Sequence, residues 1–514
     1  MITPSPNILW FLTDQLHAAC LGHAGRPEVR TPHLDALARD ATRFAQAYCN
    51  NPICGPSRVS MITGRYPHDT RITGNNLFDT DLPLPPGGTV ATRLRHAGYR
   101  TALVGKAHMI GTWDDAGFEQ RRYCDLCDSP RGNITHNHYF RYLIDHGLAD
   151  RYDLGARFEG QPGHELKRFV SDIPEAHTVE TWTGDQALGT LDRFAETPSR
   201  PWMMQLSFQR PHEPLCVPPE RTADYDPAGL TLPDNAADFF DRRFAGKPTF
   251  QRDYIKAGVR GYPYRPEDRG DLAGQLAHYY TLITMIDRQI GRVIDHLKTT
   301  GDYSNTLILF TADHGDFAGE HGLILKNLGL YEAIHRVPLL VKWPTSRTGS
   351  QQPEAGTTHD GLVELVDLAP TMLDAAGLDA DDLPGRRLAD VATGRAAPLR
   401  HTVCEYDFSS AQPFTVAVRD HRWRLVLYPW QTDAAGQRIG ELYDHDADPG
   451  ELDNRFDDPA ATADRLRLTD AALAHVSRFR RDHSTRDDPN SPVDTRVLFQ
   501  QRGMPWAELE QRLR

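Results

Sequence analysis

The sequence predicts an α/β protein in which helices sandwich a large, mostly parallel sheet, with a smaller C-terminal α+β subdomain. Three observations lead to this prediction. Short apolar or β-branched runs alternate with amphipathic helical stretches over most of the 514 residues. Strand, helix and strand follow one another at the spacing of parallel crossover connections. From about residue 400 the pattern changes to the two-residue period of antiparallel strands.

The expected elements can be placed along the chain. Buried strands are predicted at residues 7–12, 100–104, 202–208, 306–310 and 337–341. Helices are predicted at residues 32–44, 90–96 and 272–298. Ligands of such sheets bind beyond the carboxyl ends of the strands, so the residues just after each strand are candidates for function.

The C-terminal part is expected to form its own sheet and helix. Its pattern predicts a hairpin, one further strand and an amphipathic helix, at residues 414–428, 440–443 and 460–480. The chain is accordingly divided into a main α/β domain, a C-terminal subdomain and a tail, at residues 1–400, 401–482 and 483–514. Two long, weakly periodic segments, residues 110–180 and 213–270, are expected to be functional connections.

Composition excludes several kinds of partner. Lys plus Arg total 57 against 70 for Asp plus Glu, a formal charge of −13, whereas a nucleic-acid-binding surface needs an excess of Lys and Arg. No run approaches the roughly 18 apolar residues of a membrane helix. The first residues lack the basic segment of a secretory signal, and the seven cysteines are dispersed. We therefore expect a cytoplasmic protein with reduced thiols.

Polar side chains follow four of the predicted strands. They are Asp14 and Gln15, Lys106 and His108, His212, and Asp313 and His314. Each one alone is compatible with a turn, a helix cap or a structural histidine, but a parallel sheet would bring all of them to one edge. Asp14, Gln15, Asp313 and His314 would offer three oxygen donors and one nitrogen, a set that suits Ca²⁺, Mg²⁺ or Mn²⁺.

The most specific stretch is Cys54-Gly55-Pro56-Ser57-Arg58. Pro56 suits the first turn of a helix and Gly64 suits its end. Cys54 would then lie at a nearly exposed helix N-terminus, where free N–H groups stabilise negative charge. From the residues alone, Cys54 is either a thiol nucleophile with a lowered pKa, a buried cysteine without a function, or the centre of an anion site.

This stretch resembles the C-x-P-S-R signature of type I sulfatases, which belong to the alkaline-phosphatase-like superfamily. Other parts of the chain resemble the same family: Gly105-Lys106-x-His108, Pro211-His212-x-Pro214, Asp313-His314-Gly315-Asp316, residues 319–322, Lys326, residues 331–338 and residues 440–452. The resemblance spans roughly residues 5–460. It is nearest to the choline-sulfatase, arylsulfatase and phosphonate-monoester-hydrolase branches.

The resemblance implies two cofactors. Cys54 would be oxidised after synthesis to Cα-formylglycine by a formylglycine-generating enzyme or its equivalent. The hydrated aldehyde would attack a sulfate monoester to give a covalent sulfo-enzyme, and would then expel sulfate. One divalent cation is implied, Ca²⁺ being expected and Mn²⁺ or Mg²⁺ the alternatives. Its implied ligands are Asp14, Gln15, the modified Cys54, Asp313 and His314.

The other site residues take their expected roles from the same resemblance. His108 would be the base that triggers release of sulfate. Lys106 and Lys326 would bind the sulfate oxygens and stabilise the charge that develops during transfer. His212, with Lys326, would bind substrate and protonate the leaving alcohol. Two residues complete the set: Arg58, which would orient the hydrated aldehyde, and Asn75, a candidate substrate contact whose alternative role is in a turn.

Two positions depart from the pattern of many sulfatases. Gln15 stands where many members have a second Asp, and an Asp-Gln pair resembles the phosphonate-monoester-hydrolase branch. His314 stands where several relatives have Asn, and an imidazole ligand shifts the metal preference toward Mn²⁺ or Zn²⁺. The choice between Ca²⁺ and Mn²⁺ is therefore open at this stage.

The sequence thus predicts a sulfatase that acts on a small-molecule or sugar sulfate ester. One alternative is a phosphonate monoester or phosphodiester hydrolase with the same site; the Lys106–His108 pair favours sulfate, because those hydrolases tend to depart from it. Two further alternatives are a metal-free thiol enzyme that relies on Cys54 and a non-catalytic binding protein. No nucleic-acid or membrane partner is expected, and a homo-oligomer is compatible with the sequence.

Overall fold

The structure is a computed structural model. It describes residues 5–72, 87–108, 116–125, 137–152, 168–249, 251, 268–326, 329–346, 353–406, 415–432 and 438–483. Much of the weakly periodic segments and all of the predicted tail except residue 483 lie outside these residues. The domain boundaries predicted at residues 400 and 482 therefore stay predictions.

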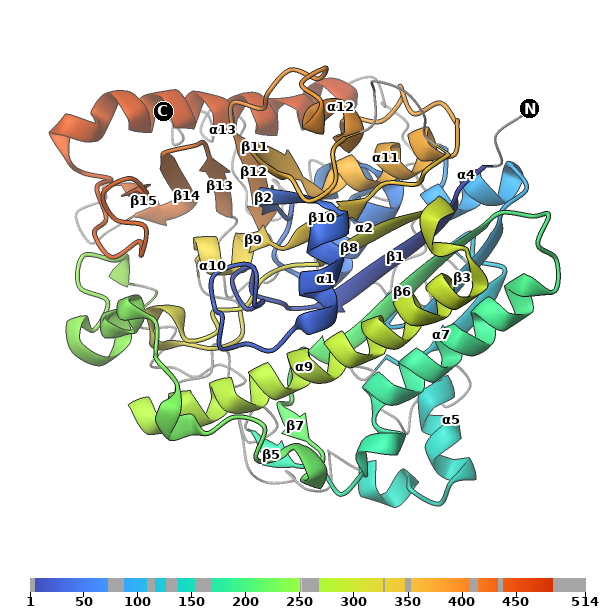
Figure 1. Cartoon of the computed structure of the whole chain (residues 1–514). Helices are drawn as coiled ribbons and strands as arrows, with labels where there is room; N and C mark the ends of the chain where they lie inside the picture. The colour runs from blue at the N-terminus through green and yellow to red at the C-terminus, as the bar shows by residue number, and fades with distance from the viewer. Residues whose placement is uncertain are drawn as a thin grey trace, which may run out of the picture.

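One large mixed sheet forms the centre of the described part of the molecule (Figure 1). Its nine described strands are β1 (Asn7–Asp14), β2 (Thr42–Tyr48), β3 (Arg100–Gly105), β4 (Gln120–Tyr123), β6 (Trp202–Pro211), β8 (Thr306–Ala312), β9 (Arg336–Val337), β10 (Leu339–Lys342) and β11 (Thr358–Glu364). They are ordered β11-β2-β10-β8-β1-β6-β3-β4, with β9 paired to β2. Strands β1, β6 and β8 are buried almost throughout, so they carry the core.

The mostly parallel character predicted from the sequence is confirmed. β1 runs parallel to β6 and β8, and β3 runs parallel to β6 and β4. β9 and β10 are the exceptions: β10 runs antiparallel to both β8 and β2, and β9 runs antiparallel to β2. The strand predicted at residues 337–341 is in fact divided into β9 and β10 at Pro338. Proline has no backbone N–H to give to a ladder, which explains the break.

Helices cover both faces of this sheet. On one face lie α1 (Pro32–Asp40), α7 (Val179–Ala195) and α9 (Arg269–Thr300), which pack against one another (Figure 1). The other face is covered by α2 (Cys54–Thr63), α4 (Val90–His96), α11 (Leu368–Ala375) and α12 (Leu388–Ala392). Smaller elements are α3 (Pro67–Thr70), α5 (His138–Asp145), α10 (Glu332–His335), β5 (Phe169–Val170) and β7 (Cys216–Val217).

The helix predicted at residues 32–44 is wrong in its last four residues. α1 ends at Asp40, and β2 begins at Thr42. β2 pairs with β9, β10 and β11, so long-range strand pairing decides its conformation. The alanines of β2 hide the two-residue alternation that predicts a strand, because Ala fits equally well on a buried or an exposed face.

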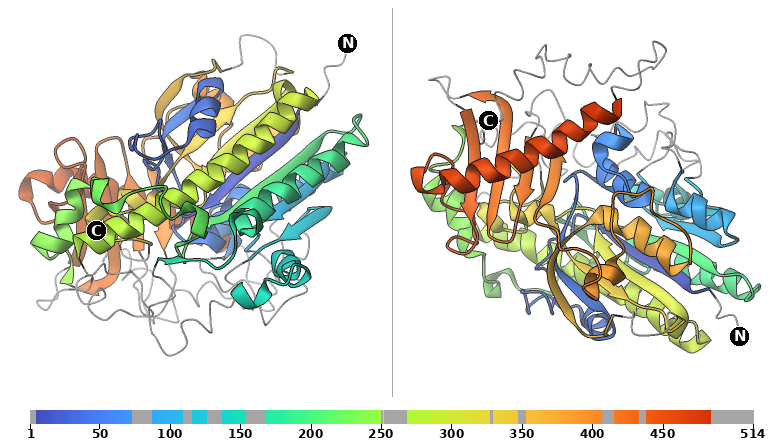
Figure 2. Two further views of the ribbon diagram at one scale, coloured as in Figure 1. Left: turned by 60° about the horizontal axis from the view of Figure 1, so that its bottom comes forward. Right: turned by 90° about the horizontal axis from the view of Figure 1, so that it is seen from above.

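An antiparallel sheet follows, as the sequence predicted, with one strand, β12, that the sequence did not predict. It consists of β12 (Thr402–Tyr406), β13 (Thr415–Arg419), β14 (Trp423–Thr432) and β15 (Arg438–Asp444). α13 (Thr462–His483) lies across it (Figure 2). Leu468, Ala472 and Val476 of α13 pack on Val416, Val418 and Leu425 in a core of their own. In the described residues, none of the helices has the length and apolar composition needed to cross a bilayer.

Candidate active site

Four adjacent parallel strands end at one edge of the large sheet. Because β8, β1, β6 and β3 are neighbours and run in the same direction, their carboxyl ends meet there. The residues that follow these ends are Asp313 and His314, Asp14 and Gln15, His212, and Lys106 and His108. The structure thus places together the polar groups that the sequence placed one by one.

Gly105 shows why the chain folds this way at the end of β3. Its φ is +101°, and a Cβ at this position would lie 1.8 Å from the carbonyl oxygen of Ser207. Only glycine adopts this positive φ without strain and also has no Cβ to clash with the carbonyl oxygen. The backbone of β3 can therefore approach β6 closely, and the amide of Lys106 donates to the Ser207 carbonyl at 2.8 Å. This contact directs Lys106 into the space between the strand ends.

α2 delivers Cys54 to the same edge. The helix begins at Cys54 and ends at Gly64, which has a φ of +67° and donates to the carbonyl of Ser60. Both ends agree with the prediction from Pro56 and Gly64. The expected exposure of Cys54 is wrong, however, because its side chain is fully buried. α2 packs against α3, α4 and α11, so the whole helix is enclosed.

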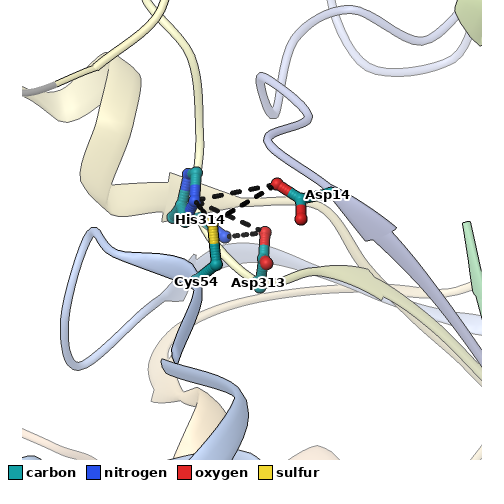
Figure 3. A group of neighbouring side chains, drawn as sticks. All are labelled: Asp14, Cys54, Asp313 and His314. Atoms are coloured by element: carbon teal, nitrogen blue, oxygen red, sulfur yellow. Dashed lines mark hydrogen bonds and ion pairs between the residues drawn. The ribbon is translucent and has the colours of Figure 1, made fainter. Parts of the chain in front are cut away.

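Cys54, Asp14, Asp313 and His314 form a compact buried cluster (Figure 3). The Cys54 Sγ lies 3.2 Å from His314 Nε2 and 3.6 Å from Asp14 Oδ1. His314 Nε2 lies 3.7 Å from Asp313 Oδ1 and 4.0 Å from Asp14 Oδ1. One ligand atom from each residue falls within 4.8 Å of the others.

The orientation of two donors in this cluster is fixed by their other contacts. His314 Nδ1 lies 2.8 Å from the carbonyl oxygen of Gly315, which can only accept, so this nitrogen carries the hydrogen. The Nε2 lone pair is consequently directed at the cluster, as in a metal-binding histidine. The Gln15 amide nitrogen donates to Asp316 and Glu213 at 2.7 and 3.1 Å, which turns its carbonyl oxygen the other way.

The ammonium of Lys326 lies against three donors of the site. Its Nζ lies 2.7 Å from Gln15 Oε1, 3.2 Å from Cys54 Sγ and 3.1 Å from His314 Nε2. Three donors thus converge on one positive charge, beside the two buried carboxylates. Oxygen donors with one imidazole suit Ca²⁺, Mg²⁺ or Mn²⁺. The residues present therefore fit the divalent cation that the sequence implied.

Arg58 joins the two carboxylates from behind. Its Nε donates to Asp313 Oδ2 at 2.8 Å, and its Nη2 lies 3.2 Å from Asp14 Oδ2. The other terminal nitrogen donates to the Ser207 hydroxyl at 2.8 Å and to the carbonyl of Lys106. Lys106 Nζ lies 2.5 Å from Asp14 Oδ2. Arginine, lysine and carboxylates are all buried, so each charge depends on its partners.

These contacts set the protonation of the acidic groups. Burial alone raises the pKa of Asp14, but the positive charges of Lys106, Arg58 and Lys326 hold it well below its ordinary value. Asp14 is therefore ionised, as a metal ligand must be. Burial, followed by the charge of Asp14, raises the pKa of the Cys54 thiol. A reactive thiolate needs the opposite shift, which speaks against the metal-free thiol enzyme.

The histidines of the site are neutral. Burial and then Lys106 lower the pKa of His108 to about 3. Burial and then Lys326 lower the pKa of His314 to about 4. Burial is also the main reason why the pKa of His212 lies well below its ordinary value, although Asp14 opposes the shift. Neutral imidazoles can accept a proton or bind a metal.

Most of the predicted site residues come together, and one cannot be placed. Asn75 lies outside the described residues. The structure adds four residues that sequence reasoning missed: Ser207, Asp125, Glu213 and Asp316. Asp125 accepts from the amide of His108 at 2.8 Å. Glu213 and Asp316 lie within the family motifs quoted above, so the sequence could have indicated them. Ser207 and Asp125 lie in none of these motifs, and nothing in the sequence indicates a function for them.

The profile of the family described as Sulfatase matches residues 6–378. This is well over half of the chain and includes every residue placed above. The chain belongs to the sulfatase family. A second profile, described as N-sulphoglucosamine sulphohydrolase, C-terminal, matches residues 319–476. It covers the Lys326 loop of this sulfatase together with the antiparallel sheet and much of α13.

Individual relatives agree with the family. This sulfatase is 28% identical over 487 residues to a choline-sulfatase of Rhizobium meliloti, covering 92% of this chain and 88% of the relative. It is 25% identical over 515 residues to an N-acetylglucosamine-6-O-sulfatase of Bacteroides thetaiotaomicron, covering 88% and 83%. A solved phosphonate monoester hydrolase from Silicibacter pomeroyi superposes with a TM-score of 0.74 at 27% identity, covering 92% and 96%. Family and named sulfatase relatives identify the chain as a sulfuric ester hydrolase.

Proposed function

We propose that this sulfatase hydrolyses a sulfate monoester with a formylglycine derived from Cys54 and one divalent cation, through a covalent sulfo-enzyme. The observation that carries the proposal is the convergence of Cys54, Asp14, Asp313 and His314 at one sheet edge, with Lys326 beside them. When bound, the cation would withdraw charge from the sulfate oxygens and lower the pKa of a hydroxyl on residue 54.

Lys106 and Lys326 would bind the transferring sulfate group. Both are buried, and they contact the site at Asp14 and at Gln15, respectively. Although burial works against the charge, Cys54, Glu213 and Asp14 raise the pKa of Lys326, which therefore stays protonated. Fixed cations in a dry pocket stabilise the charge that develops in transfer far better than water does.

Proton transfers fall to the two neutral histidines. His108, held by Asp125 through its amide, would accept the proton when sulfate is expelled. His212 holds its Nδ1 hydrogen against the carbonyl of Glu213 at 2.8 Å, which leaves Nε2 for the substrate. An arriving sulfate anion favours the imidazolium form of His212. His212 and Lys326 would then share the protonation of the leaving alcohol.

Arg58 would hold residue 54 and the two carboxylates at fixed positions relative to one another. It touches both Asp14 and Asp313, and it stands in the first turn of the helix that begins with Cys54. Its planar guanidinium can hold two carboxylates at fixed positions, which lysine cannot do. The expected cation is Ca²⁺, with Mn²⁺ or Mg²⁺ as alternatives.

Mass spectrometry of the peptide that contains Cys54 tests the modification. Conversion of the thiol to an aldehyde lightens this peptide, and the aldehyde reacts with a hydrazine probe. We expect both signs in protein that was produced together with a formylglycine-generating enzyme, and activity in proportion to the modified fraction. Full activity in protein whose Cys54 is entirely thiol would contradict the proposal.

The second candidate is a phosphonate monoester or phosphodiester hydrolase. Gln15 favours it, because a neutral ligand leaves the site with one negative charge fewer than an Asp pair does. The likeness to the Silicibacter pomeroyi hydrolase points the same way. Lys106 and His108 favour sulfate, as the sequence argument stated.

Specificity constants decide between the two candidates. An aryl sulfate, a phenyl phosphonate ester and a bis-aryl phosphate with the same leaving group should be compared on one preparation. We expect the largest kcat/KM for the sulfate; a larger value for either phosphorus ester would favour the second candidate. A panel of sulfated sugars and small sulfated alcohols would then identify the organic half of the substrate.

A further inference from the structure

A second group of metal-ligating side chains lies between the large sheet and the C-terminal subdomain. His68 lies in α3, Glu405 lies in β12, and His475 lies in α13. Their side chains are only 9%, 5% and 6% exposed. These residues, here called the histidine–glutamate cluster, come from three distant parts of the sequence.

The donor atoms of this cluster converge on one point. His68 Nδ1 lies 2.7 Å and His475 Nε2 lies 2.6 Å from the same oxygen, Glu405 Oε1. These two imidazoles are the side-chain partners of Glu405 in the part of the chain that the structure describes. Two imidazoles and a carboxylate are a donor set that binds Zn²⁺.

Asp69 supplies the outer contact that a metal-binding histidine needs. The other ring nitrogen of His68, Nε2, lies 3.2 Å from Asp69 Oδ1. Metal-ligating histidines usually donate this second N–H to a carboxylate, which fixes the ring and strengthens the bond to the ion. His68 has the ring orientation that this arrangement requires, with Nδ1 toward the cluster.

Tyr66 lies against both histidines of the cluster. Its ring stacks on His68 with an interplanar angle of 7° and meets His475 edge-on at 85°. The two histidine rings stand at 89° to each other. The tyrosine hydroxyl donates to Glu364 at 2.7 Å, which holds the ring in place. The aromatic ring therefore fixes the orientation of both imidazoles, and the three protein donors leave the fourth position of a tetrahedral zinc to a water molecule.

The charges of the cluster favour a divalent cation. Glu405 and Asp69 bring two carboxylates, and the partners within hydrogen-bond distance of Glu405 are neutral or singly charged imidazoles. Glu405 is buried and Asp69 is partly exposed, and one proton on His68 balances only one of these two carboxylates. A Zn²⁺ ion bound by neutral histidines balances both carboxylates.

Insertion of the ion requires a small expansion. Tetrahedral zinc with bonds of about 2.0 Å keeps its ligand atoms about 3.3 Å apart, so each imidazole would move by about 0.6 Å. His475 stands on the surface helix α13, which can take up this movement without disturbing the large sheet.

We propose that His68, Glu405 and His475 bind a structural Zn²⁺ ion that fastens α13 and β12 to the segment after α2. Two ligands come from the C-terminal subdomain, and the third follows the helix that carries Cys54. The ion would thus join α3 to β12 and α13, elements that lie more than 300 residues apart in the sequence. This inference does not depend on the reaction at Cys54.

Zinc content of the purified full chain tests the proposal. All samples carry Asp313→Asn, so that the cluster around Cys54 does not contribute, and are loaded with Zn²⁺ and then desalted. We expect one zinc per chain, a loss of at least about tenfold in affinity in Glu405→Gln and His475→Gln, and no change in His421→Gln. His421 is an exposed histidine of the same subdomain and serves as the matched control.

Equal zinc content with and without Glu405→Gln would overturn the proposal, as would a chain that retains no zinc after loading. A second measurement covers the case that the variants fail to fold. Crystals of the unsubstituted protein, soaked in Zn²⁺, should give an anomalous peak at the zinc absorption edge between His68 Nδ1 and His475 Nε2. An anomalous map without this peak would overturn the proposal independently of any variant.

Discussion

The cluster around Cys54 and the histidine–glutamate cluster use the same kinds of donor in opposite surroundings. Both join carboxylate and imidazole in buried places. Around Cys54, three permanent cations, Lys106, Lys326 and Arg58, lie within bonding distance of the donors. Around Glu405, the neighbours are imidazoles, a tyrosine and a further carboxylate.

The comparison shows that the balance of charge around the donors, rather than the kinds of donor, indicates which ligand a buried site binds. A site that has more cationic side chains than its carboxylates need for charge balance can bind an anion as well as a metal cation. A site with unbalanced carboxylates has room for a cation alone. The first arrangement suits a sulfate ester, and the second suits a structural ion.

Replacing Cys54 should produce the largest effect. Cys54→Ala removes the only group in the cluster that can become the nucleophile, so we expect kcat to fall by about 10⁴-fold or more. The small cavity left behind should lower the free energy of unfolding by about 1 kcal/mol. Steady-state kinetics and urea unfolding measure the two quantities. Cys20→Ala, a buried cysteine of the core, is the control, and a Cys54→Ala chain that fails to fold would contradict the placement.

Lys326→Ala tests whether the surplus cations act on the substrate. The lost charge-assisted contact should reduce kcat/KM by about 30- to 1,000-fold, equivalent to about 2–4 kcal/mol. Lys342→Ala removes a lysine that is buried at the far end of the sheet, where its Nζ donates to backbone carbonyls. That variant should lose stability but keep its kcat/KM. Equal losses of kcat/KM in both would mean that Lys326 acts through folding alone.

The acidic surplus beside the second cluster predicts a pH dependence of stability. Burial raises the pKa of Glu364, the partner of the Tyr66 hydroxyl, to about 7. The native state therefore holds this proton more tightly than the unfolded chain does, and stability falls as pH rises from about 4.5 to about 7, by about 3 kcal/mol. Unfolding in urea at pH 5 and pH 8 measures the difference.

Glu364→Gln should abolish this part of the pH dependence, because the amide does not titrate. Glu354→Gln changes an exposed glutamate of the same segment and should leave the profile as it is. If the stability of both variants depends on pH as that of the unsubstituted protein does, Glu364 is not the group that takes up the proton on folding.

Metal exchange gives the smallest effect and compares the two clusters directly. After treatment with a chelator, Ca²⁺ should restore turnover with little change in the thermal midpoint. Zn²⁺ at one hundredfold its Kd should raise stability by about 2.7 kcal/mol, because it binds the folded chain alone. The Zn²⁺ effect should persist in Asp313→Asn and vanish in His475→Gln. Indistinguishable responses to the two ions would remove the distinction drawn between the clusters.

The sequence predicted the strand ends well, for a physical reason. Apolar strands of a doubly covered sheet are visible as short runs, and the parallel arrangement then forces Asp14, His212 and Asp313 to one edge. The helix predicted at residues 32–44 was too long, because pairing with distant strands makes its last residues part of β2. The burial of Cys54 was equally invisible, since it depends on α11, which lies about 300 positions later.

The histidine–glutamate cluster could not be predicted at all. His68, Glu405 and His475 have no common spacing and stand in elements of three different kinds. Their meeting depends on how α13 lies across β13 and β14, which is a property of packing. A sequence motif identifies residues that lie in one short segment. The residues of this cluster come together only when the C-terminal subdomain has packed against the rest of the chain.

The guanidinium of Arg58 has a consequence for the loading of the proposed ion. Two buried carboxylates left to themselves would repel each other and open the pocket, but Arg58 bridges Asp14 and Asp313 from within the polypeptide. If the site binds a cation as proposed, the chain should therefore be able to complete its folding before the ion arrives. Loading would then be a local exchange of ligands, and removal of the ion should silence the enzyme reversibly.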